Sequence, residues 1–97
     1  MTVFAVEYVY DDATAAVRDE VRPAHRAWLG GLAEEGMVLA SGPTDSGAGA
    51  LILVVAEDRP ALEELLRQDP FQVQGLVAST SARDWNPVIG RLVEFAA

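Results

Sequence analysis

The stretch ALILVVAED, residues 50–58, is apolar at its first seven positions and constrains the architecture more than any other segment. Its length and its β-branched residues predict a strand. In a strand, Leu51, Leu53 and Val55 point to one side while Ile52 and Val54 point to the other. A strand that is apolar on both sides belongs to a sheet that is covered on both faces.

Strand and helix patterns alternate on either side of this strand. The segment TVFAVEYVY (2–10) is rich in β-branched and aromatic residues and predicts a first strand. The helical segment that follows is interrupted by Pro23, which predicts either two helices or one kinked helix that ends at Gly36. The remaining predicted elements are a strand over 37–42, a loop over 44–49, a helix over 59–68, a short capped turn or helix over 69–75, a strand over 76–85 and an extension strand over 90–96.

The predicted order is therefore β-α-β-β-α-β, the split arrangement of ferredoxin-like folds in the α+β class. We expect a four-stranded antiparallel sheet with both helices on one face, in a single domain over 1–97. The first strand is also apolar on both sides, with Phe4, Val6 and Tyr8 alternating with Val3, Ala5 and Val9. The simplest way to bury the second face is to pack it against the same face of the sheet in another copy of the chain. This predicts a homodimer, or a higher oligomer, with the architecture of a dimeric α+β barrel.

Composition excludes several classes of function. The net charge is −8, and the seven basic residues are scattered arginines, so the field disfavours nucleic acid. The chain has no cysteine and one histidine, which excludes disulfides, thiolate metal sites and multi-histidine metal sites within one chain. We therefore predict no metal. The amino terminus has no pattern of a signal peptide, and the longest apolar run is too short for a bilayer, which needs about 20 residues. We expect a cytoplasmic protein without membrane contact.

The only histidine, His25, falls on the same helical stripe as Trp28, Leu29 and Leu32. One interpretation is a core histidine that only donates to a backbone carbonyl. The other is an acid–base group, which works best when a carboxylate orients the imidazole. The carboxylate that a second helix would bring near His25 is Asp69, but an aspartate before a proline is also a common helix cap. The spacing does not choose between these interpretations.

Six further residues are candidates for a pocket around His25. Arg22, one turn before His25, is suited to an anionic group, although an exposed arginine is equally expected there. Gly42 and Pro43 stop the second predicted strand and would line a cleft with Ser41 as a hydrogen-bond donor. Phe71 and Trp85 would supply apolar walls, or they are ordinary core aromatics.

In combination, RPAHRAWLGGL (22–32), GMVLASGP (36–43), GALILVVAED (49–58), DPFQVQGLV (69–77) and ARDW (82–85) resemble the YciI-like, or YCII-related, proteins. The resemblance runs from Val3 to about Trp85. It implies a ferredoxin-like subunit of a dimeric α+β barrel with an active site built around a His–Asp pair, which maps onto His25 and Asp69. One branch of the family is associated with dehydrochlorination of a chlorinated aromatic.

Two functional hypotheses follow. The first is a small enzyme of lyase or hydrolase type, without a cofactor, in which His25 and Asp69 carry out acid–base chemistry on a small, aromatic molecule. The second is a non-catalytic dimer that binds a small molecule or serves a larger assembly. The segment 86–97 lies outside the resemblance, and its role is open.

Overall fold

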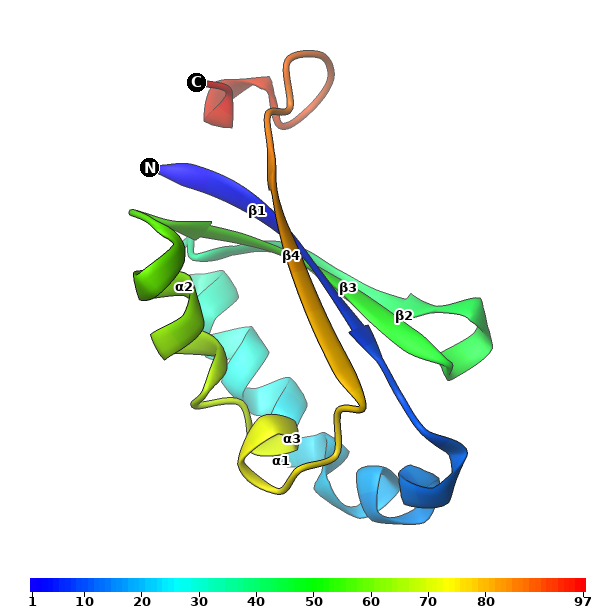
Figure 1. Ribbon diagram of the computed structural model, residues 1–97. Coiled ribbons are helices and arrows are strands. Elements are labelled where there is room, and N and C mark those ends of the chain that lie inside the picture. The colour runs from blue at the N-terminus through cyan, green and yellow to red at the C-terminus, as the bar shows by residue number, and fades with distance from the viewer.

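A computed structural model describes all residues from 1 to 97 and contains one antiparallel sheet of four strands (Figure 1). The strands are β1 (Thr2–Val9), β2 (Val38–Thr44), β3 (Gly49–Ala56) and β4 (Ser79–Trp85). Their spatial order is β2-β3-β1-β4, so the first strand is central and β2 and β4 are the edges. This topology confirms the predicted α+β, ferredoxin-like fold.

The helices lie together on one face of the sheet (Figure 1). They are α1 (Ala15–Glu34), α2 (Arg59–Leu66) and the single-turn α3 (Pro70–Val73), with short 3-10 turns at Asp12–Thr14, Asp45–Gly47 and Val93–Phe95. No helix combines the length and the apolar character needed to cross a membrane.

The helix α1 is continuous, although Pro23 lies inside it. The alternative of two separate helices is therefore wrong. Pro23 is on the exposed side of α1, where the backbone carbonyl that loses its partner remains near water. Buried residues at regular intervals, Arg18, His25 and Leu32, anchor the helix on both sides of the proline. Gly36, with φ +83°, ends the helical segment as predicted.

The core lies between the sheet and the helices. Alternate residues of the two central strands point into it, which explains why buried positions alternate along β1 from Phe4 and along β3 from Ala50. From these strands the buried side chains are Phe4, Val6, Tyr8, Ala50, Ile52, Val54 and Ala56. Helices α1 and α2 cover them with Leu32, Leu62 and Leu66.

The opposite face of the sheet has no helix on it (Figure 1). It carries the other half of the strand residues, including Leu51, which is 37% exposed, and Val9, which is 52% exposed. Leu53 and Val55, on the same face, are half-buried. The sequence prediction that the sheet is apolar on both sides is therefore confirmed in the monomer.

Strand β2 continues through Gly42 and Pro43 to Thr44, so the prediction that these two residues stop it is wrong. Pro43 lies opposite Ala50 in the ladder. A proline cannot donate a ladder hydrogen bond, but β2 is an edge strand, and one of its sides needs no partner.

The predicted strand over 90–96 is also wrong. The chain leaves the sheet after Trp85 and forms a separate turn with Val93–Phe95 in a 3-10 helix (Figure 1). Pro87 has no N–H for a ladder, and Gly90 turns the backbone with φ +109°. Strand β4 begins at Ser79 rather than at residue 76, because the N–H of Leu76 instead donates to the Phe71 carbonyl at 2.8 Å and closes the end of α3.

Candidate functional site

The site begins with α1, which turns His25 toward the sheet. Arg18, His25 and Leu32 are seven residues apart, two helical turns, and therefore lie on one stripe. His25 is only 6% exposed. Its position on the apolar side of the helix follows from this spacing.

Asp69 lies directly behind His25. Its Oδ1 is 2.7 Å from His25 Nδ1, and the residue is fully buried. Asp69 also caps α3, because the same Oδ1 accepts from the Phe71 N–H at 2.9 Å. The two interpretations of Asp69 are therefore not exclusive: the aspartate is a helix cap and the partner of the histidine.

Tyr8 completes this buried network. Its hydroxyl donates to Asp69 Oδ2 at 2.8 Å, so both carboxylate oxygens are occupied. Burial raises the pKa of Tyr8, and the charge and hydrogen bond of Asp69 raise it further, so the phenol stays protonated. Tyr8 was predicted only as a core residue. A tyrosine at an inward strand position carries no sign in the sequence of which acceptor its hydroxyl meets.

Phe71 fixes the plane of the imidazole. The two rings are stacked with centroids 3.9 Å apart and planes 5° from parallel. Tyr10 meets the same phenyl ring edge-on, with centroids 5.8 Å apart. The hydrogen bond to Asp69 and the stack on Phe71 together leave the imidazole one orientation.

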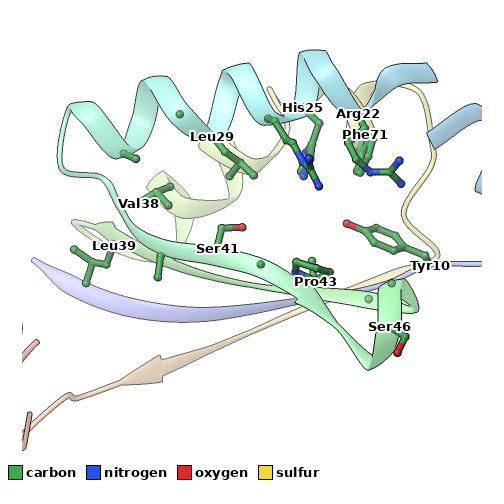
Figure 2. Close-up of a pocket in the computed structure, with 18 residues that line it drawn as sticks. Tyr10, Arg22, His25, Leu29, Val38, Leu39, Ser41, Pro43, Ser46 and Phe71 are labelled. Carbon is green, nitrogen blue, oxygen red and sulfur yellow. The ribbon is translucent and has the colours of Figure 1, made fainter. Parts of the chain in front are cut away.

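A cleft of about 800 Å³ opens beside His25, between α1 and β2. Figure 2 shows His25, Arg22 and Leu29 reaching into it from the helix, with Ser41 and Pro43 on the strand across from them. Of the residues predicted from the sequence, those that line the cleft are Arg22, His25, Ser41, Gly42, Pro43 and Phe71. Asp69 does not line it but supports His25 from behind.

Trp85 lies away from the cleft. It is at the end of β4, opposite Val3 in the ladder, and is 41% exposed. Residues that lie opposite each other in the ladder point to the same face, so Asp84, opposite Phe4, points toward the helices. Trp85 is the next residue along the strand and therefore points to the face without helices. The structure therefore does not bring Trp85 to the other predicted site residues.

Several lining residues were not predicted. Leu29 is four positions after His25 and Arg26 is four positions after Arg22, so helical spacing places each beside a predicted site residue. Tyr10 follows β1, and its hydroxyl points into the cleft (Figure 2). Burial raises the pKa of Tyr10, and the charge of Asp69 adds to this effect, while Arg18 and Arg22 oppose it. Tyr10 therefore offers an intact O–H.

The chain contains no group of three histidine, cysteine, aspartate or glutamate side chains that is placed to hold a metal ion. The hydrogen-bonding groups on the cleft wall are two arginines, the imidazole and the hydroxyls of Tyr10, Ser41 and Ser46. These groups suit hydrogen bonding and proton transfer to an organic molecule.

The geometry predicts one tautomer of neutral His25. A carboxylate accepts hydrogen bonds and cannot donate, so Nδ1 carries the proton and Nε2 has a free lone pair. In ¹⁵N NMR spectra the single histidine is expected to show a protonated Nδ1 and an unprotonated Nε2. The Asp69→Asn variant is the control, because its amide can donate to Nδ1 and allow the other tautomer. A wild-type spectrum with a protonated Nε2 would contradict the assignment.

Comparison with solved structures gives relatives with the same fold. The dehydrochlorinase TftG from Burkholderia phenoliruptrix AC1100, which acts on 5-chloro-2-hydroxyhydroquinone and was solved in complex with 2,5-dihydroxybenzoquinone, is 25% identical with a TM-score of 0.75. The match covers 87% of this chain and 93% of TftG. An antibiotic biosynthesis monooxygenase is 14% identical with a TM-score of 0.58, covering 89% and 97% of the two chains. Rv0793 from Mycobacterium tuberculosis is 12% identical with a TM-score of 0.54, covering 92% and 96%.

Comparison with curated proteins gives no match. A family model, by contrast, matches residues 2–86, which is most of the chain and includes every residue of the site described above. The chain therefore belongs to the YCII-related domain family.

Proposed function

We propose that the protein is a small enzyme of lyase or hydrolase type that carries out acid–base chemistry, without a cofactor, on a small aromatic molecule bound in the cleft. The observation that carries this proposal is the buried His25–Asp69 pair, 2.7 Å apart, whose imidazole lines a cleft of about 800 Å³. A general base needs a fixed orientation and access to its substrate, and this arrangement supplies both.

In the proposed reaction, Asp69 holds the proton on Nδ1, and Nε2 of His25 removes a proton from an acidic O–H of the substrate. The electrons of that O–H bond move into the ring, and the imidazolium returns the proton to the ring carbon that bears the leaving group X, which gives the keto tautomer of the substrate. His25 then removes the proton of a second O–H, whose electrons form a second C=O and shift the ring double bonds, and X departs from its carbon with the bonding pair. The imidazolium then gives its proton to water. The net change is the loss of one H–X from the substrate, with no electron donor or acceptor required.

The similarity to TftG supports this reaction type. That enzyme is named for the dehydrochlorination of a chlorinated hydroxyhydroquinone. We propose a hydroxylated, halogenated aromatic as the substrate class of the present protein, because loss of HCl from such a ring needs a base and no further reagent.

The experiment is to incubate the protein with a panel of hydroxylated chloroaromatics and to measure released chloride. We expect one chloride for each product molecule, and only the background rate with His25→Ala. Binding of panel members without chloride release would instead support a non-catalytic binding protein. Equal release by the wild type and by His25→Ala would overturn the role of the histidine.

We also propose that the protein forms a homodimer through the face of the sheet that carries no helix. Leu51 and Val9 are partly exposed there, while Glu7 and Arg83 form an ion pair of 3.0 Å on the same face. A second sheet would remove this apolar area from water.

Sedimentation is expected to give the mass of a dimer for the wild type and of a monomer for Leu51→Glu, since an unpaired carboxylate would be buried in the interface. Ile89→Glu is the matched control, because Ile89 is 90% exposed in the C-terminal segment. It should remain dimeric. A monomeric wild type would contradict the proposal.

A further inference from the structure

The charge of the cleft is opposite to that of the whole chain. The sequence has 15 acidic residues and seven basic ones, yet no aspartate or glutamate lines the cleft. Arg22 and Arg26 do line it. The wall thus offers a bound anion two charged donors and no competing carboxylate, since the buried Asp69 lies behind His25 with both oxygens occupied by hydrogen bonds.

The arginines follow the turns of α1. Arg18, Arg22 and Arg26 are four residues apart, so they lie on the same side of the helix. Like charges at this spacing repel each other along a helix. An anion bound between Arg22 and Arg26 would relieve that repulsion.

The innermost of these cations is not neutralised by a carboxylate. Arg18 is 4% exposed, and its guanidinium lies over the ring of Tyr10, 4.5 Å from the centroid. It donates to the Asp11 carbonyl at 2.8 Å and to the Thr14 hydroxyl, which are both neutral acceptors. Its charge therefore persists behind Tyr10, a lining residue of the cleft.

The two arginines on the wall differ in their partners. Arg22 is paired with Asp19 at 2.6 Å, on an exposed side of α1, while Arg26 is exposed and has no ion pair. Exposed pairs such as that of Arg22 are weak and exchange readily for other partners. Both guanidinium groups are thus available to a bound anion.

The other residues that line the cleft indicate the chemistry of the rest of the ligand. Apolar side chains lie on both walls of the cleft, with Leu29 on α1 and Val38 and Pro43 on β2, and the Ser41 hydroxyl lies between the latter two along the strand (Figure 2). Because the pKa of Tyr10 is raised, its hydroxyl is a donor at neutral pH. The cleft thus combines apolar side chains on both walls with hydroxyl donors, which favours a flat ligand with an apolar body and several acceptor atoms.

We propose that the cleft binds a planar aromatic acid as its anion, a carboxylate or a phenolate, with the charged group on Arg22 and Arg26 and the ring against Leu29 and Pro43. This inference rests on the proposed function, because the same ligand would present its reacting group to His25. It narrows the substrate class to aromatic molecules that are already ionised at neutral pH.

The test measures binding rather than turnover. Benzoate is compared with benzamide, and 2,4-dinitrophenolate with 2,4-dinitroaniline, following the His25 imidazole signals by NMR at low ionic strength. A charge-assisted hydrogen bond predicts that the anion of each pair binds about tenfold or more tightly than the neutral molecule. The pair with the larger ratio of anion affinity to neutral affinity decides between a carboxylate and a phenolate. About 0.5 M NaCl should remove most of the difference.

Single substitutions separate the site from the general charge of the protein. Arg26→Gln and Arg22→Gln should each weaken binding of the anion about three- to tenfold and leave the neutral probe unchanged. Asp19→Asn should strengthen anion binding about twofold, because it frees Arg22. Arg91→Gln removes the same charge in the C-terminal segment, outside the cleft lining, and should have no effect.

Equal affinity for the charged and neutral members of both pairs would overturn the inference. So would equal effects of Arg26→Gln and Arg91→Gln, which would indicate only the overall charge. Failure of the proposed function has a different signature: charge-selective binding would persist while no member of the chloroaromatic panel released chloride.

Discussion

Replacing His25 by alanine is expected to lower kcat for chloride release by about 10²–10⁴-fold, the usual contribution of a positioned acid–base group. No other residue on the cleft wall replaces it. The wall has no carboxylate, its arginines stay protonated, and the raised pKa of Tyr10 keeps that phenol from acting as a base near neutral pH.

The fall in kcat must be distinguished from a change in the structure of the cleft, because His25→Ala also removes the stack on Phe71. Added imidazole is expected to restore part of the rate of His25→Ala by entering the space that the side chain leaves. Arg91→Gln is the control: it changes a polar side chain outside the cleft lining and should retain full activity. A kcat for His25→Ala within twofold of the wild type, with an unchanged circular dichroism spectrum, would exclude His25 as the base.

The sequence predicts the two central strands well because the signal is local. Residues 2–9 and 50–56 are short runs rich in β-branched and aromatic side chains, and they form β1 and β3. The sequence-based predictions are wrong where the structure of a segment depends on residues far away in the sequence. Pro43 remains in a strand because β2 lies at an edge, and position at an edge depends on the order of all four strands.

The candidate site was predictable to different degrees. The face of α1 that carries His25 and Leu29 follows from helical spacing, and the same rule places Arg26 one turn after Arg22. The pairing of His25 with Asp69 joins residues 44 positions apart; the predicted fold offered it as one alternative, and only the family resemblance favoured it over a plain helix cap. The position of Trp85 depends on its register with Val3, which the sequence pattern does not specify. The catalytic role of the pair stays a prediction.

The largest expected effect on stability is that of Asp69→Ala. The substitution removes the acceptor of three buried donors, Tyr8 OH, His25 Nδ1–H and the Phe71 N–H. A buried donor without a partner costs about 1–3 kcal/mol, and some recovery is expected from water and from the other imidazole tautomer. We therefore expect the free energy of unfolding to fall by about 3–5 kcal/mol, measured by urea denaturation.

Asp58→Ala provides the matched control. Asp58 also caps a helix that has proline in its first turn, and it accepts a single hydrogen bond, from the Ala61 N–H at 2.9 Å. Its loss is expected to cost about 1 kcal/mol. The excess for Asp69→Ala then measures the contacts with His25 and Tyr8.

Tyr8→Phe divides that excess further, because it removes only the donor to Oδ2. Its effect should be smaller after Asp69→Ala than in the wild type, since the hydroxyl then has no acceptor to lose. Equal costs for Asp69→Ala and Asp58→Ala would mean that Asp69 is only a cap. The imidazole would then be held by its stack on Phe71 alone, and a fixed tautomer, on which the proposed proton transfer depends, would have no structural cause.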